Sequence, residues 1–228
     1  MKKFGLTNNQ LKIIAMLSML VDHIGVQLFP DLQILRIIGR LALPIFAYMI
    51  AEGCYYTKNR VKYLSLIAIL AALCQIVYFI ADGSLYLGIL VVFSLSICII
   101  FSIDEFLKKK NAVSFLVVLL TVGFVIFLTF ACPKLLYSYW FAIDYGIYGI
   151  ILPVVIYFAK GKWMKLISAA IVLAALATTL PSYQWYALAA LPLLCLYNGQ
   201  RGKANLKYLF YIFYPTHLAV IYLIDMIL

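Results

Sequence analysis

Apolar residues fill the chain in long runs, and short polar stretches separate these runs. A transmembrane helix needs about 20 mostly apolar residues, so the runs predict about nine such helices. Their ranges are roughly 9–29, 33–57, 62–81, 85–103, 112–132, 138–159, 163–180, 183–198 and 206–227. The seventh and eighth runs are short and only Leu180-Pro181-Ser182 divides them, so an arrangement with eight spans stays open. The pattern predicts an all-α, polytopic bundle of transmembrane helices.

Composition agrees with a membrane protein. Of the 228 residues 67% are hydrophobic and 11% are charged, whereas soluble domains are roughly 45–50% apolar and about 25% charged. No stretch is long and polar enough for a separate soluble domain, so we expect one domain covering residues 1–228. The first apolar run contains Asp22 and His23 and has no cleavage motif, so it is expected to remain as an uncleaved span. The cysteines show no metal-ligand spacing, so no metal is expected.

Basic residues indicate the orientation of the bundle. Fifteen of the 18 lysines and arginines fall at the chain start or on alternate loops. They are Lys2, Lys3, Lys12, Lys58, Arg60, Lys62, Lys108, Lys109, Lys110, Lys160, Lys162, Lys165, Arg201, Lys203 and Lys207. Cytoplasmic loops are enriched in such residues. We therefore expect a multi-pass protein of the cytoplasmic membrane, with its N-terminus in the cytoplasm and its C-terminus outside. The net charge of +10 then reflects topology and lipid attraction, and no nucleic-acid partner is expected.

Ionisable residues inside the apolar runs are costly and by default mark functional sites. They are Asp22, His23, Arg36, Arg40, Glu52, Asp144, His217 and Asp225. In the predicted orientation His23, Arg40 and His217 lie near the middle or in the outer half of the membrane, and these groups predict one polar pocket. Structural roles compete with this interpretation, because an arginine can snorkel and a histidine can simply join two helices by a hydrogen bond.

Lys12 and His23 are separated by ten residues in the first run. On a helix they share one face, about 16–17 Å apart along the axis. A cation in line with a base suits a long ligand with an anionic head and a reactive end, such as an acyl-coenzyme A. The loop Tyr197–Lys203 adds two glycines and two cations, which favour phosphate but also fit a plain cytoplasmic turn.

Several longer motifs occur together and in order. They are LKIIAMLSMLVDHIG at 11–25, RIIGRLALPIFAYMIAEGCYYTKNRVKYL at 36–64, YNGQRGK at 197–203 and YLFYIFYPTHLAVIYLI at 208–224, with the weaker IDYGIYGIILP at 143–153. On these segments the chain resembles the TraX family of membrane acetyltransferases, which is known for N-terminal acetylation of a pilin subunit. It is also similar in pattern to the broader acyltransferase type 3 families.

The resemblance implies an acetyl-coenzyme A-dependent acyltransferase. Such an enzyme would move an acyl group from cytoplasmic acyl-coenzyme A to an amine or hydroxyl of an extracytoplasmic peptide or glycan. A proton-coupled small-molecule transporter is the alternative function that the intramembrane acids and histidines leave open.

The resemblance and the positions of the cytoplasmic cations together imply roles for individual residues. The expected catalytic residues are His23, Asp22, His217 and Arg40, and the expected donor-binding residues are Lys12, Glu52, Lys58, Arg60, Arg201 and Lys203. His23 is the expected general base, with an acyl-histidine intermediate as the alternative route. Asp22 points about 100° away from His23 on a helix, so we expect it to pair with Arg36 or Arg40, while His217 or a tyrosine orients His23.

Overall fold

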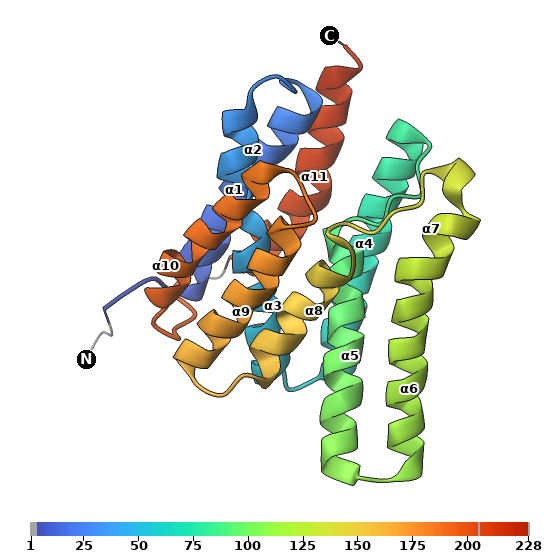
Figure 1. Cartoon of the computed structure of the whole chain (residues 1–228). Helices are drawn as coiled ribbons and strands as arrows, with labels where there is room; N and C mark the ends of the chain where they lie inside the picture. Colours follow the sequence, from blue (N-terminus) through green and yellow to red (C-terminus); the bar gives the residue numbers. More distant parts are fainter. Residues whose placement is uncertain (1–3, 205, 228) are drawn as a thin grey trace. The chain divides into compact units, whose positions relative to one another are not determined.

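The computed structural model describes residues 4–204 and 206–227, without the side chains of Asp82, Lys207 and Tyr208 (Figure 1). Its helices are α1 (Asn8–Gln27), α2 (Gln33–Gly39), α3 (Ala42–Tyr56), α4 (Arg60–Asp82), α5 (Ile89–Lys109), α6 (Ala112–Ile126), the π-helix η1 (Phe127–Ala131), α7 (Cys132–Leu135), the 3₁₀-helix η2 (Tyr137–Tyr139), α8 (Gly146–Phe158), α9 (Lys162–Ala177), the 3₁₀-helix η3 (Ser182–Ala189), α10 (Ala190–Cys195) and α11 (Lys207–Asp225). The described residues contain only isolated bridges and no strand. The all-α prediction is therefore confirmed.

The chain divides into two compact units. The first comprises Met1–Met49 and Ala159–Leu228, and the second comprises Ile50–Phe158. Helices α1, α2, α9, η3, α10 and α11 belong to the first unit, and α4 to α8 belong to the second. The prediction of a single domain stays a prediction.

Among the described residues, four helical stretches are long and apolar enough to cross a membrane, which marks the chain as a membrane protein. They are Gln33–Tyr56, Arg60–Ala81, Ile89–Lys109 and Ala112–Leu135. Gly146–Phe158 and Leu209–Asp225 are apolar but shorter. Nine spans and the orientation of the termini are not confirmed. The eighth predicted span is instead the eight-residue η3 followed by the six-residue α10, which together are shorter than a membrane-crossing helix requires.

Local side-chain chemistry determines where several helices begin. Thr7 caps α1 through a capping box, in which its hydroxyl accepts from the amide of Gln10 and the Gln10 side chain accepts from the amide of Thr7. Asn59 and Asn111 cap α4 and α6 in the same manner, each accepting from the amide three residues later. These side chains satisfy amides that the first helical turn leaves without a partner.

In the first unit, α11 packs against α1 and runs parallel to it. Near the start of both helices the Lys12 ammonium lies 5.2 Å from the ring centre of Phe210. Near their ends Gln27 Nε2 donates to Asp225 Oδ2 at 2.6 Å. Residue numbers thus rise together along both helices. The residues of α1 and α11 that meet on this face therefore lie at corresponding positions along the two helices.

In the second unit, α5 and α6 lie side by side as a helical hairpin, and α4 and α8 also pack against α5 (Figure 1). A buried apolar cluster that includes Val92, Ile99, Val125 and Ile150 joins α5, α6 and α8. Arg60 at the start of α4 forms an ion pair with Asp104 on α5. The second unit is therefore held by an apolar core together with ion pairs near one end of α4 and α5.

Glycine allows α1 and α2 to approach closely in the first unit. A Cβ added at Gly25 would lie 2.7 Å from the Cβ of Leu35, and one added at Gly39 would lie 2.2 Å from Asp22 Oδ1. Both positions are buried. Since ordinary carbon contacts are about 3.5–4.0 Å, a side chain at Gly39 would force the Asp22 carboxylate to move.

We predict that Gly39→Ala destabilises the protein by about 1–3 kcal/mol, because the new methyl group overlaps a buried carboxylate. Thermal unfolding of the detergent-solubilised chain measures the effect. Gly123→Ala is the matched control, because Gly123 is exposed on α6 and nothing lies within 4 Å of an added Cβ. Equal midpoints for Gly39→Ala and the wild type would show that α1 and α2 are not packed in this way.

Candidate functional site

Asp22 on α1 forms ion pairs with two arginines of the following segment. Its Oδ2 lies 2.9 Å from Arg36 Nη1, and its Oδ1 lies 2.5 Å from Arg40 Nη2. Asp22 is 8% exposed and Arg40 is 4% exposed. Arg36 and Arg40 lie four residues apart where α2 ends, so they project from the same side toward one carboxylate. The predicted pairing of Asp22 with Arg36 or Arg40 is present with both residues.

Arg40 links this ion pair to the segment after α9. Its Nη1 donates to Gln184 Oε1 at 3.0 Å, and its Nε donates to the carbonyl of Arg36 at 3.1 Å. The guanidinium groups of Arg36 and Arg40 also lie 5.7 and 5.5 Å from the ring centre of Tyr183. We call Asp22, Arg36, Arg40 and Gln184 the Asp22 cluster. It connects α1, the end of α2 and η3.

His23 and His217 meet across the α1–α11 contact. Nδ1 of His23 lies 2.8 Å from Nε2 of His217, and the two ring planes differ by only 1°. His217 Nδ1 lies 2.8 Å from the backbone carbonyl oxygen of Phe213, one helical turn earlier. His217 is buried, and His23 is half-buried. The structure therefore brings together two histidines that are 194 positions apart.

This chain of contacts determines the tautomers of the neutral pair. The carbonyl of Phe213 only accepts, so Nδ1 of His217 must carry the proton and donate. Nε2 of a neutral His217 then has a lone pair, and it accepts from Nδ1–H of His23. The remaining nitrogen, Nε2 of His23, is left with a lone pair, and it has no hydrogen-bond partner in residues 4–204 and 206–227. His23 is thus oriented as a base.

Aromatic residues of α11 hold the His217 ring in place. The ring of Phe213 stacks on it with centres 4.7 Å apart, and the ring of Tyr214 meets it edge-on at 5.5 Å. Pro215 lies inside the same helix and lacks a backbone N–H, so one carbonyl in the preceding turn loses its helical partner. Stacking and the bond to Phe213 together restrain both the position and the tilt of His217.

Three of the predicted donor-binding residues lie at the N-terminal end of α1 in the first unit. The amide of Asn9 donates to the carbonyl of Arg201 at 3.1 Å, and Nδ2 of Asn9 donates to the carbonyl of Ala204 at 2.6 Å. Arg201 and Lys203 are exposed on this loop. Lys12 follows one turn into α1. The structure thus brings Lys12 and the 201–203 loop to the same end of α1.

The other three predicted donor-binding residues belong to the second unit. Arg60 is committed to ion pairs with Asp104 and Glu105, and its guanidinium lies 5.0 Å from the ring centre of Phe101. Glu52 is buried and Lys58 is exposed. These contacts give Arg60 a structural role. A donor-binding role for any of the six stays a prediction.

Sequence reasoning missed Tyr183 and Gln184. Both lie in the short polar stretch that follows Pro181. The polar side chain of Gln184 within an otherwise apolar region was the signal that could have pointed to this segment. For Asp144 an arginine was the partner considered, whereas the structure supplies a tyrosine in the second unit. Tyr86, in the loop between α4 and α5, donates its hydroxyl to Asp144 Oδ1 at 2.7 Å. Burial and the neighbouring carboxylate raise the pKa of Tyr86 well above its usual range.

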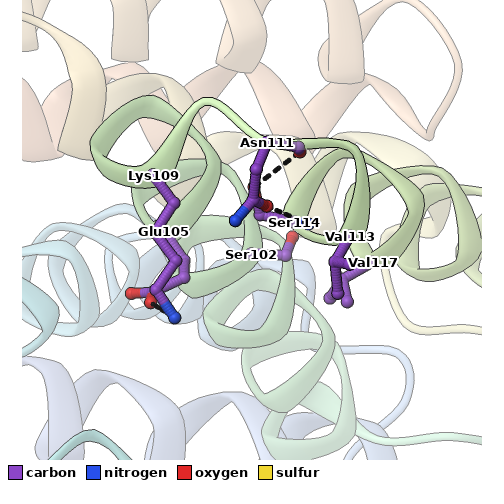
Figure 2. A pocket seen from close by; sticks show the side chains of 7 residues that line it. All are labelled: Ser102, Glu105, Lys109, Asn111, Val113, Ser114 and Val117. Carbon is purple, nitrogen blue, oxygen red and sulfur yellow. Dashed lines mark hydrogen bonds and ion pairs between the residues drawn. The ribbon is translucent and has the colours of Figure 1, made fainter.

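A shallow pocket in the second unit lies at the turn between α5 and α6 (Figure 2). Its polar lining is already engaged, because Asn111 Oδ1 accepts from the amide of Ser114, and Lys109 forms an ion pair with Glu105. The Ser102 hydroxyl donates to the carbonyl of Ile99. These contacts lie within α5 or cap α6, so the pocket is a feature of the hairpin turn.

Comparison with known proteins assigns the family. Residues 7–225 match the family described as TraX protein. The chain belongs to the TraX family. It is 30% identical over 234 residues to the probable fimbrial assembly protein FimC, serogroup H1, of Dichelobacter nodosus, and the match covers 93% of each chain. It is 43% identical over 58 residues to the uncharacterized protein RP591 of Rickettsia prowazekii (strain Madrid E), or 25% of this chain and 23% of that one. No solved structure matches it.

These matches overturn the function predicted from the sequence. They name the TraX family and a fimbrial assembly protein, and they support no relationship to the acyltransferase type 3 families. The prediction of general acyl transfer from cytoplasmic acyl-coenzyme A to an extracytoplasmic amine or hydroxyl was wrong. The transporter alternative was also wrong. The TraX assignment itself is confirmed.

We predict that Asp22→Ala is severely destabilising, by about 3–5 kcal/mol, because it leaves two arginine charges without their shared carboxylate. The thermal midpoint and the yield of inserted protein measure the loss. Asp31→Ala is the matched control, because Asp31 is exposed in the loop that follows α1. If both variants unfold at the same temperature, the ion pairs do not hold this TraX-family fold together.

Proposed function

We propose that this chain acts in fimbrial assembly at the cell membrane, where it acetylates the amino terminus of a pilin subunit. Membership of the TraX family supports the proposal, because the resemblance links that family to pilin acetylation. The similarity to a probable fimbrial assembly protein over 93% of both chains supports it independently. The proposal is limited to pilin and includes neither a glycan acceptor nor general acyl transfer across the membrane.

The observation that carries the proposed chemistry is the hydrogen bond between His23 and His217. Acetylation of an amine forms a bond between its nitrogen and the acetyl carbon, and it breaks the bond between that carbon and the leaving group. The amine must also lose a proton as it attacks. Nε2 of His23 takes this proton, since its lone pair is available when His23 donates through Nδ1.

His217 acts as a positioning residue in this mechanism. It accepts from His23, and the carbonyl of Phe213 accepts from His217. Enzymes that catalyse acyl transfer usually hold the general base in place with a second group. A third group then orients the second one. Protonation of His23 would spread charge along this chain of hydrogen bonds, so the pair stabilises the transient imidazolium.

Asp22 has a different role from the one that its place beside His23 implies. Both of its carboxylate oxygens are engaged with Arg36 and Arg40, so neither serves His23. The Asp22 cluster holds the end of α1 against α2 and η3. By fixing this part of α1, the cluster determines where His23 stands relative to α11.

The nature of the acetyl donor is a separate prediction. Acetyl-coenzyme A remains the expected donor, with Lys12, Arg201 and Lys203 as candidate contacts for its phosphates, since all three lie at one end of α1. No step of the proton transfer depends on this assignment. Adding labelled acetyl-coenzyme A to the purified chain and a pilin peptide tests the donor on its own.

We predict that His23→Ala abolishes acetylation of the pilin amino terminus while the protein remains folded and inserted. The variant removes the proton acceptor but leaves the ion pairs of Asp22 intact. Intact mass of the pilin N-terminal peptide, isolated from cells carrying each variant, measures the modification. Gln27→Ala is the control on the same face of α1, because its side chain contacts Asp225 and not the histidines.

Two results would contradict this function. One is an acetylated pilin in cells that carry only His23→Ala, which would remove His23 from the reaction. The other is a pilin that lacks the acetyl group even in wild-type cells, which would remove pilin acetylation itself.

We further predict that His217→Phe lowers the acetylation rate without abolishing it. Phenylalanine preserves the ring stack on Phe213 but offers His23 no acceptor. The pH profile of the residual rate separates this role from a purely structural one. Loss of the acceptor changes the titration of His23 and should shift the profile, whereas a packing defect would lower the rate equally at every pH.

A further inference from the structure

The Asp22 cluster carries one more positive charge than negative. One carboxylate faces the guanidinium groups of Arg36 and Arg40, and each carboxylate oxygen is already paired with one of them. The side chains of Asp22 and Arg40 are only 11% and 5% exposed. A net charge in such surroundings is costly unless a counter-ion neutralises it. The charge of the cluster therefore favours an anionic ligand at its accessible side.

Gln184 supplies a second, independent indication of a missing partner. Its Oε1 must face Arg40, because a guanidinium only donates hydrogen bonds, and this orients the whole amide. The Nε2 group of Gln184 is buried and has no hydrogen-bond partner among the described residues. The residue is 1% exposed. A buried donor without an acceptor costs free energy, so an oxygen atom absent from the protein itself would satisfy it.

Arg36 is the accessible member of the cluster. Its side chain is 20% exposed, compared with 5% for Arg40. The contacts to Asp22 use Arg36 Nη1, at 2.9 Å to Oδ2 and 3.3 Å to the backbone carbonyl. In residues 4–204 and 206–227 its other two nitrogens have no hydrogen-bond acceptor. Both guanidiniums also lie over Tyr183, the residue directly before Gln184. The free donors of Arg36 and Gln184 thus belong to one compact region.

We propose that the Asp22 cluster binds the carboxylate of an acidic side chain near the amino terminus of the acceptor peptide. This inference rests on the proposed function, because it takes the pilin subunit as the ligand. The guanidinium of Arg36 matches a carboxylate through two parallel hydrogen bonds, and Gln184 Nε2 donates to it as well. The added negative charge neutralises the cluster.

Asp22 and His23 are neighbours on α1. Their spacing determines how far the acidic residue lies from the free amine of the peptide. An amine held at His23 leaves the next few residues of the peptide close to the neighbouring Asp22 cluster. Recognition of the carboxylate would therefore select peptides with an acidic residue shortly after the free amine. The cluster becomes a specificity determinant, whereas the histidine pair handles the proton.

Binding of matched peptides to the full-length purified chain tests the proposal. The probes are short fluorescent peptides with a free amino terminus, each with a single glutamate at a successive position, and twins that carry glutamine there. One glutamate peptide is expected to bind about tenfold more tightly than its twin, as loss of a charge-assisted hydrogen bond predicts. Equal affinities for every pair of twins would overturn the proposal.

Two substitutions then test the assigned residues. Arg36→Gln removes the excess charge and the free donors, and Gln184→Glu replaces the unpartnered N–H by an acceptor and adds a negative charge beside Arg40. Both should abolish the preference for glutamate. Lys134→Gln is the control, because it removes one exposed positive charge from the second unit. A preference that survives both cluster variants would overturn the assignment.

Stability distinguishes a ligand site from a structural role for Gln184. If its amide serves a ligand, Gln184→Glu should raise the thermal midpoint of the unliganded protein while it removes peptide selectivity, because it relieves an unpaired donor and an uncompensated charge. A lower midpoint would show that the amide is needed for folding and would overturn its role as a free donor.

Anionic lipid is the competing source of the counter-ion. If phosphatidylglycerol raises the thermal midpoint of the wild type and the protein binds both peptides of every pair equally, the ligand is a lipid headgroup and the peptide assignment fails.

Acetylation of pilin is measured separately by mass. Unselective peptide binding with intact His23-dependent acetylation rejects only this inference, whereas selective binding with no acetylation in the wild type rejects the proposed function.

Discussion

The first unit depends on one buried carboxylate. Asp22 neutralises part of the charge of Arg36 and Arg40, and in doing so it fixes the end of α2 against α1. The approach is close enough that Gly39 has no room for a side chain. Arg40 then extends the network to Gln184, which ties η3 to the same point. Removing the carboxylate would leave two guanidinium groups with no shared acceptor in an apolar environment.

That network also gives two neighbouring residues on α1 different partners. Asp22 is occupied by arginines, so it does not form a dyad with His23, and His23 pairs with His217 on α11. The backbone carbonyl of Phe213 takes the place that a carboxylate often has behind a catalytic histidine. A neutral carbonyl orients the pair without adding a negative charge beside the two histidines.

The comparisons and the contacts together narrow the function. Membership of the TraX family and the likeness to a fimbrial assembly protein support the proposal of a pilin subunit as the acceptor. They do not support a broad range of acceptors. The six predicted donor contacts differ in their surroundings. Arg60 is engaged by Asp104 and Glu105 in the second unit, whereas Lys12 and the 201–203 loop share one end of α1.

Much of the local structure follows from the sequence alone. Apolar runs give the helices, and Thr7, Asn59 and Asn111 determine where three of them start. The shared face of Lys12 and His23 was also predictable, and both contact α11 as expected of one helix face. Such features depend on the 3.6-residue period and on neighbours within a turn, which the order of residues specifies directly.

Only the tertiary structure decided which distant groups meet. His23 contacts a residue 194 positions away, and Arg40 contacts one 144 positions away. Tyr183 and Gln184 join the site because the stretch expected to be a span is a short 3₁₀-helix that packs against α2. The sequence by itself determined the helices and the chemical groups on their faces. Which helix supplies the partner of a buried charge depends on how the faces pack, and no local period encodes that choice.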